Sequence, residues 1–190
     1  MTQPNLIDAA AVRTSVAGLA AQLAADPKPG IVHPKVMTRL VGNLTSESRF
    51  TQYDKTFTFR CDEAVERGGR AEEPSPMRYL LSGVAFCLQV WYAKGAAFAE
   101  CALESLEIDL ESFLDMRGEH LIAGVPPNPQ YLTMEVRVGS TSPAETVLQM
   151  IDDGDRRCPL SNLVALAVPI YQRVVHNGQV IRDTVPADHA

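Results

Sequence analysis

The sequence predicts an α+β protein in which antiparallel strands lie around one long apolar helix. Apolar and polar residues alternate over Val36–Asp62, and again over 103–114 and 131–138, with the period of half-buried strands. Between these segments, Tyr79–Ala99 is apolar at most positions and is long enough for a buried helix. The order of strands, buried helix, strands, helix and hairpin is that of an α+β fold.

The N-terminal segment is predicted to be a separate helix. Residues 5–25 carry apolar side chains at helical spacing, and this run ends before the breaker "DPKPG" at 26–30. The apolar positions are Leu6, Ala10, Val16, Leu19 and Leu23. We therefore expect an N-terminal helix and hinge over residues 1–30, followed by a single domain over residues 31–190.

The segment Val36–Asp62 predicts two or three antiparallel strands, with Phe57 and Phe59 on one face. A charged loop containing Gly68-Gly69 follows. Ser75 as N-cap and Pro76 at the first helical position then begin the long helix, which reaches about Ala99. Because this helix is apolar on almost every face, a second copy of the chain is expected to cover part of it, as a homodimer.

Two more strands, one more helix and a hairpin complete the prediction. The alternation in "LESLEIDLESFL" and "YLTMEVRV" indicates an antiparallel pair around the Pro-rich loop 125–129. Ser142, with Pro143 next and Glu145 three residues later, predicts a capping box at the start of a helix. Asn177-Gly178 between β-branched runs is typical of a two-residue hairpin turn.

Composition and charge exclude several classes of function. The chain has 17 Lys and Arg against 23 Asp and Glu, with no basic cluster longer than a pair, so nucleic acid is not an expected partner. Gln89 and Lys94 interrupt the apolar helix, so a membrane span is not expected, and the N-terminus lacks a secretion signal. The cysteines are too scattered for a disulfide scaffold, and the histidines lack zinc spacing. We expect a cytoplasmic protein with reduced thiols, no metal and no cofactor.

Cys158 stands in "RRCPLSN", between two arginines and a proline. Pro159 suits the first position of a helical turn, which would put the sulfur of Cys158 at a helix N-terminus. The helix dipole, with Arg156 and Arg157 nearby, would then lower the pKa of the thiol below about 8.5. The alternative is that Cys158 is a small apolar residue that fills a corner between helices.

Cys87 lies on the long helix in one stripe with Leu80, Val84, Leu88 and Trp91. On this evidence alone it is a core residue. A buried thiol is kept neutral by its apolar neighbours, so reactivity would need a cation from another element. Arg78 is too far along the same helix, and Arg39 and Arg49 on the first strands remain possible.

These motifs together resemble the OsmC/Ohr family. The similarity rests on "PSPMRYLLSGVAFCLQVWYA", then "LESLEIDLES", then "RRCPLSNLV", and it extends from about residue 36 to residue 182. The N-terminal helix and the loop 118–130 are similar to a longer OsmC-like branch. The resemblance implies an OsmC-like fold, with antiparallel sheets and a long buried central helix, in an intertwined homodimer with sites at the subunit interface.

The resemblance also implies a thiol peroxidase that reduces organic or fatty-acid hydroperoxides. Cys87 would be the peroxidatic thiolate and Cys158 the resolving thiol, and a dithiol reductant would recycle the disulfide. Phe86 and Trp91, with Met77, would contact an apolar hydroperoxide. In the family a Glu follows the helix-opening proline and pairs with an activating arginine. Here Met77 replaces that Glu, and Arg49 falls near the position of the arginine.

A second function remains open. Met77 can neither carry charge nor accept a charge-assisted hydrogen bond, which favours a non-catalytic relative that binds an apolar small molecule at the dimer interface. In that case the cysteines would stay reduced.

Overall fold

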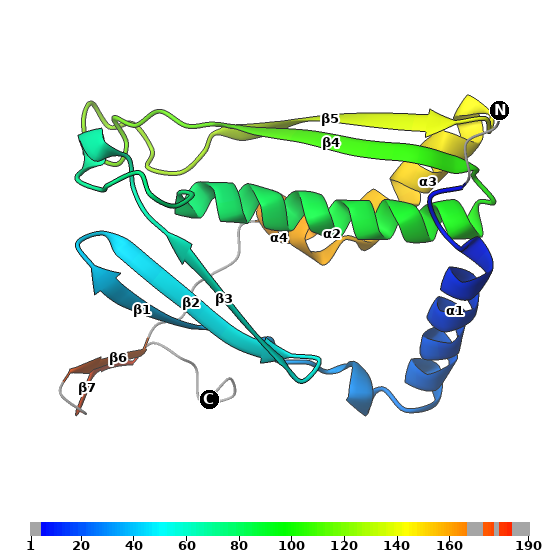
Figure 1. Ribbon diagram of the computed structural model, residues 1–190, viewed down its shortest axis with the longest axis horizontal. Helices are drawn as coiled ribbons and strands as arrows, with labels where there is room; N and C mark the ends of the chain where they lie inside the picture. Colours follow the sequence, from blue (N-terminus) through cyan, green and yellow to red (C-terminus); the bar gives the residue numbers. More distant parts are fainter. Residues whose placement is uncertain (1–4, 167–172, 177–178, 184–190) are drawn as a thin grey trace.

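The computed structural model describes residues 5–166, 173–176 and 179–183. Its centre is the long helix α2 (Pro76–Phe98), which lies against the two-stranded antiparallel sheet of β4 (Leu103–Phe113) and β5 (Tyr131–Ser140) (Figure 1). The helices α3 (Ala144–Arg157) and α4 (Pro159–Ala165) pack along another side of α2. The predicted α+β class is confirmed.

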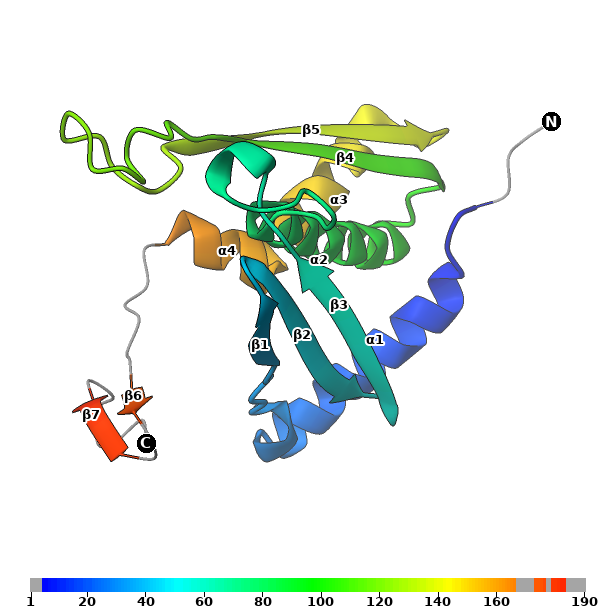
Figure 2. The same ribbon diagram turned by 60° about the vertical axis from the view of Figure 1, so that its left-hand side comes forward.

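The N-terminal half forms a helix and a three-stranded sheet. Helix α1 (Ala9–Ala25) is followed by the antiparallel strands β1 (Met37–Gly42), β2 (Thr45–Gln52) and β3 (Lys55–Cys61), which pair in that order. Short 3-10 turns cover Lys28–Gly30 and Val65–Arg67. This sheet stands at an angle to α2 and approaches it at the start of the helix (Figure 2). Phe59 of β3 packs against Tyr79 there, with ring centroids 5.2 Å apart.

The strand pairings follow the predicted alternation. In the β4–β5 sheet, Ile108 lies opposite Val136 and Leu110 lies opposite Met134. Ile108 and Val136 both pack against the core cluster. The strands β6 (Arg173–His176) and β7 (Gln179–Asp183) form the predicted antiparallel pair. The Asn177-Gly178 turn lies outside the described residues.

The helix starts agree with the sequence for α2 but not for α3. Ser75 is the N-cap of α2 and Pro76 its first residue, as predicted. The predicted capping box at Ser142 is wrong, because Pro143 is the N-cap of α3 and receives no side-chain hydrogen bond. The Ser142 hydroxyl instead accepts a hydrogen bond from the Ala102 amide at 2.9 Å, just before β4. A tertiary partner has replaced the local one.

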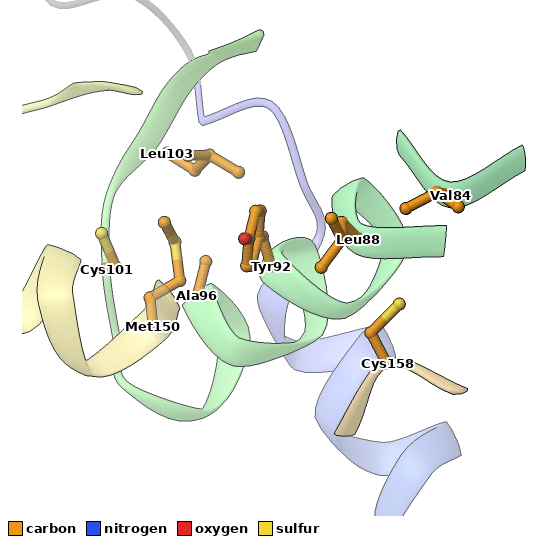
Figure 3. Packing of buried hydrophobic residues seen from close by; sticks show 8 residues of the cluster. All are labelled: Val84, Leu88, Tyr92, Ala96, Cys101, Leu103, Met150 and Cys158. Carbon is orange, nitrogen blue, oxygen red and sulfur yellow. The ribbon is translucent and has the colours of Figure 1, made fainter. Parts of the chain in front are cut away.

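Two glycines bring α2 and α3 into close contact. A Cβ on Gly95 would lie 2.7 Å from the Met150 carbonyl oxygen, and one on Gly154 would lie 2.4 Å from the Tyr92 ring. Tyr92 and Met150 are fully buried, and the surrounding core extends from Val84 to Cys158 (Figure 3). The helix packing at this point therefore depends on the absence of side chains.

Helix α1 contacts the C-terminal end of α2. Arg13 donates a hydrogen bond from Nη1 to the Ala97 carbonyl oxygen at 2.7 Å, and the Leu6 amide donates to the Leu103 carbonyl at 2.6 Å. Ile7 packs against the core cluster. The guanidinium satisfies a carbonyl that has no partner within α2 and complements the negative end of its dipole.

Several large apolar side chains of α2 stay exposed. Leu80, Phe86, Val90 and Phe98 are each about half exposed or more, and we call these four residues the open apolar face. None of the helices among the described residues is long and apolar enough to cross a bilayer.

Replacing Gly95 with alanine is expected to destabilise the protein by about 1–3 kcal/mol, because the added methyl group would collide with the backbone of α3. Gly83→Ala on the same helix is the matched control. Its Cβ would make an ordinary contact with Leu160 Cδ1 at 3.9 Å, so its better helix propensity should add about 0.5–1 kcal/mol of stability. Urea unfolding measures both changes. A Gly95→Ala variant as stable as the parent would contradict the close approach.

Candidate active site

The structure brings Cys87 and Cys158 together from distant parts of the sequence. Cys87 lies in the middle of α2 and is partly exposed, whereas Cys158 lies between α3 and α4 and is fully buried. Both are free thiols, and their side chains lie within hydrogen-bonding reach of each other. The sulfur of Cys158 points toward α2 at the edge of the core (Figure 3). This dithiol pair is the candidate site.

Residues 155–162 form a corner that fixes Cys158. Cys158 is the N-cap of α4, and its Sγ accepts a hydrogen bond from the Ser161 amide at 3.4 Å. The side chain of Asn162 donates to the Cys158 carbonyl at 2.7 Å and to the Asp155 carbonyl at 3.1 Å. Since one amide group joins the end of α3 to the start of α4, the corner keeps a single geometry.

The corner is also tied to the core. The Tyr92 hydroxyl, at the centre of α2, donates a hydrogen bond to Asp155 Oδ1 at 2.6 Å. Burial, together with this carboxylate, raises the pKa of Tyr92 well above its ordinary value, so the hydroxyl stays protonated as a donor. Tyr92 thus links the position of α3 to that of α2.

Hydrogen bonds favour a thiolate at Cys158. Burial opposes the charge, but it is outweighed by donation from the hydroxyl and amide of Ser161, from the Cys87 thiol and from the Leu160 amide, so the pKa of Cys158 is lowered. The predicted helix start at Pro159 is confirmed. The predicted contribution of Arg156 and Arg157 is wrong, because both pair with Asp153 on the exposed side of α3.

Cys87 is the protonated partner. Burial raises its pKa, and the neighbouring Cys158 adds to this effect, while the Leu160 amide and the positive charge of Lys94 act in the opposite direction. The pair therefore carries its first negative charge on Cys158, with the Cys87 S–H donating toward it. Two thiols that interact this strongly titrate as a unit.

Arg49 is not brought to the dithiol pair within one chain. Residues two apart on a strand share a face, so Arg49 lies on the face of β2 that carries Glu47. Phe59 pairs with Ser48 and belongs to the opposite face, which is the one that packs against Tyr79 of α2. Arg39, the other candidate, is bound to Glu47, with the Arg39 Nη2 to Glu47 Oε1 distance 2.7 Å.

An apolar cavity of about 600 Å³ adjoins the site between α2, α4 and the far end of the β4–β5 sheet. Met77, Val84 and Leu88 line it from α2, and Ser161 and Val164 line it from α4. Val84 and Leu88 flank Cys87, and Ser161 binds the sulfur of Cys158. Neither cysteine lines the cavity itself; it reaches their neighbours Val84, Leu88 and Ser161 and extends along the first turns of α2.

The predicted substrate-binding residues have different positions. Met77 lines the apolar cavity, as expected for a contact with an apolar ligand. Trp91 is half-buried one turn after Cys87 and packs against the core cluster. Phe86 is 65% exposed on the open apolar face and does not line the cavity.

Three contributors were missed from the sequence. Ser161 and Asn162 act through local hydrogen bonds that depend on the exact turn after Cys158, which the pattern Cys-Pro alone does not specify. Lys94 was treated only as an interruption of an apolar segment. Its spacing of seven residues from Cys87, two helical turns, is the signal that could have identified it. Among the described residues no cluster of three or more His, Cys, Asp or Glu side chains could hold a metal ion.

The fold and the paired thiols define an α+β protein with a two-cysteine site. The model of the OsmC-like protein family matches residues 69–172, more than half of the chain, and the chain belongs to this family. The matched segment contains both Cys87 and Cys158, whereas α1 and β1–β3 precede it. A comparison with curated proteins finds no match.

Solved structures of the same family share the fold at low sequence identity. An OsmC-like protein from Mycoplasma pneumoniae is 15% identical, with a TM-score of 0.59 over 70% of this chain and 88% of that one. An OsmC-like protein of unknown function from Vibrio cholerae is 10% identical, with a TM-score of 0.53 over 70% and 93%. A protein from Legionella pneumophila named an organic hydroperoxide resistance protein is 16% identical, with a TM-score of 0.50 over 70% and 91%.

The reduced protein is expected to show thiolate ultraviolet absorbance at a pH below the ordinary range for cysteine, because the pKa of Cys158 is lowered. Cys158→Ala should remove this early step, and Cys101→Ala, which replaces another buried cysteine, should leave it. A single titration at the ordinary cysteine pKa would contradict the assignment.

The shifted pKa values of Cys158 and Cys87 determine how the stability of the protein depends on pH. Since the folded state favours the Cys158 thiolate, the contribution of this group to the unfolding free energy rises as pH increases from its folded-state pKa to the unfolded value. The raised pKa of Cys87 acts in the opposite direction at higher pH, where the folded state still holds the proton that the unfolded chain releases.

Proposed function

We propose that the protein is a thiol-dependent peroxidase that reduces organic or fatty-acid hydroperoxides through Cys87 and Cys158. The observation that carries the proposal is the contact between two free thiols from separate elements, beside an apolar cavity of about 600 Å³. A peroxide bond needs a thiolate to attack it and a second thiol to trap the sulfenic acid before further oxidation. Membership of the OsmC-like family supports this chemistry.

The first step uses the difference in exposure and acidity between the two thiols. Cys87 is the partly exposed thiol, so it meets the hydroperoxide, and the Cys158 thiolate accepts its proton across the hydrogen bond between them. The Cys87 thiolate attacks the terminal oxygen, an S–O bond forms and the O–O bond breaks. The departing alkoxide takes the proton from Cys158 and leaves as an alcohol.

The second step closes a disulfide. The Cys158 thiolate, restored when its proton left, attacks the sulfur of the Cys87 sulfenic acid. An S–S bond forms, and the hydroxide that departs takes a proton from solvent to become water. Together the two thiols give up two electrons, which the hydroperoxide has taken. A dithiol reductant of the cell would restore the pair by thiol–disulfide exchange.

The apolar cavity sets the substrate class. Its lining is dominated by the side chains of leucine, valine and methionine, and Ser112, Asn128, Gln130 and Ser161 are among its few polar residues. An alkyl or acyl chain would lie there with its hydroperoxide toward Cys87. Hydrogen peroxide has no apolar part to bury and gains nothing from these walls.

Homodimerisation is part of the proposal. Besides the open apolar face of α2, the β1–β3 sheet also exposes apolar side chains, with Leu40 68% and Phe57 41% exposed. An apolar surface spread over a helix and a sheet is typical of a subunit interface. In a dimer, this surface would be covered by the same surface of a second copy.

A slight excess of cumene hydroperoxide is expected to consume two thiols of the reduced protein and yield a disulfide between Cys87 and Cys158, with hydrogen peroxide reacting more slowly. Cys158→Ser should stop at a sulfenic or more oxidised Cys87, because no resolving thiol is present. Cys61→Ser, at the end of β3, is the matched control and should behave as the parent. Peptide mass analysis and thiol counting give the readout.

No loss of thiols under excess hydroperoxide would overturn the peroxidase. The second function would then stand, a non-catalytic OsmC-like protein that binds an apolar small molecule. Met77 and the apolar cavity favour that alternative. Binding of a fluorescent fatty acid to the reduced protein, with no change in its thiols, would identify it.

Sedimentation is expected to show a dimer at micromolar concentration, and Phe86→Glu should shift it to the monomer, because a buried unpaired carboxylate is strongly unfavourable at an apolar interface. Leu121→Glu is the matched control. Leu121 is 84% exposed in the loop after β4, so its replacement should leave the dimer intact. A monomeric parent protein would contradict the proposed assembly.

A further inference from the structure

Cys87, Trp91 and Lys94 share one face of α2. They are spaced by four and then three residues, so they lie above one another along the helix. Side chains on a helix lean toward its N-terminus, which directs the long side chain of Lys94 back over Trp91 toward the turn of Cys87. The Lys94 Nζ lies 4.3 Å from the centre of the Trp91 ring. The ring holds the ammonium group in place by a cation–π interaction.

Helix α1 forms a wall beside Lys94. A groove of about 400 Å³ between α1 and α2 is lined by Val12, Ser15 and Val16 from α1, and by Val90 and Lys94 from α2. This lining contains no carboxylate. Lys94 forms no ion pair with any of the described residues, so its charge is not neutralised by a neighbour. An apolar wall reduces screening by water and lets this charge act over a longer distance.

The other cations near the site are held elsewhere. Arg39 and Arg60 both bind Glu47 on the far face of the β1–β3 sheet. Arg156 and Arg157 both bind Asp153. The charge of Lys94 favours ionisation of Cys87 and acts against the burial that raises the pKa of this thiol.

We propose that Lys94, held over Trp91 and walled by α1, supplies the positive charge that stabilises the thiolate of Cys87. Met77 cannot hold an arginine at the start of α2. Lys94, two turns after Cys87, instead places a positive charge on the C-terminal side of the thiol. Lys94 is a positioning residue for charge and does not touch the substrate. A role of Lys94 in catalysis rests on the proposed peroxidase function. Its effect on the acidity of Cys87 does not depend on that function.

The test measures the pH profile of Cys87 alkylation by iodoacetamide in a Cys158→Ser background, by peptide mass analysis. This background removes the one titrating group that faces Cys87 from α3 and α4, and α1 presents no charged side chain to the groove. Lys94→Met is expected to slow alkylation about three- to fivefold at neutral pH and to move the profile to higher pH. Lys94→Arg should restore the rate, and Lys55→Met, which removes an exposed lysine at the β2–β3 turn, should have no effect.

A second pair of variants tests the wall. Ser15→Glu places a carboxylate in the groove beside Lys94 and should slow alkylation as Lys94→Met does, whereas Thr14→Glu, the adjacent exposed position of α1, should not. A Lys94→Met variant that melts at the parent temperature and alkylates at the parent rate would overturn the proposal. Because the readout is alkylation of Cys87, the result can be interpreted even if the protein has no peroxidase activity. Equal slowing by Ser15→Glu and Thr14→Glu would show that the groove beside Lys94 is not the cause of the slower alkylation.

Discussion

The close approach of α2 and α3 is the constraint on which the candidate site depends. Gly154 lies against the ring of Tyr92, and Gly95 lies against the backbone of Met150. Once the helices are in contact, the Tyr92 hydroxyl reaches Asp155, whose carbonyl accepts from Asn162. Asn162 in turn holds the carbonyl of the residue that carries the second thiol. A displacement of α3 by the width of one methyl group would therefore separate Cys158 from Cys87, although neither glycine touches a sulfur atom.

The same geometry decides which thiol carries the charge. Two adjacent thiolates in a buried setting repel each other, so the pair keeps one proton over a range of pH. Donors converge on Cys158 from the first turn of α4, while for Cys87 the effect of burial outweighs the Leu160 amide and the charge of Lys94. Negative charge is therefore stored on the inaccessible sulfur, next to a partly exposed thiol that can pass its proton across one hydrogen bond. Cys87 is therefore the thiol that a substrate can reach, and Cys158 is the more acidic thiol.

Periodicity and turn chemistry were sufficient to predict most of the fold, whereas the pairing of Cys87 with Cys158 was expected only from the family resemblance. The three-stranded sheet, the β4–β5 pair, the start of α2 and the turn at Pro159 follow from local patterns that the tertiary structure leaves unchanged. Ser142 failed as a cap because a backbone amide before β4 became its partner. Arg156 and Arg157 failed as activating charges because Asp153, one helical turn earlier, binds both. The choice between Arg39 and Arg49 stayed open because a strand position alone does not say which face of the strand meets α2. These errors concern choices among possible partners, and such choices depend on the fold.

Met77 and Lys94 can be understood together. A carboxylate at position 77 would require a guanidinium, yet Arg39 is bound to Glu47 and Arg49 lies on the same side of the sheet, away from α2. Without that partner, a carboxylate in the apolar cavity would oppose ionisation of the nearby thiol. Methionine avoids this penalty and extends the apolar wall available to a ligand. The positive charge then has to come from α2 itself, and Lys94 supplies it where α1 limits the access of water. Helix α1 precedes the segment that the family model matches, so the wall beside Lys94 comes from a part of the chain outside that segment.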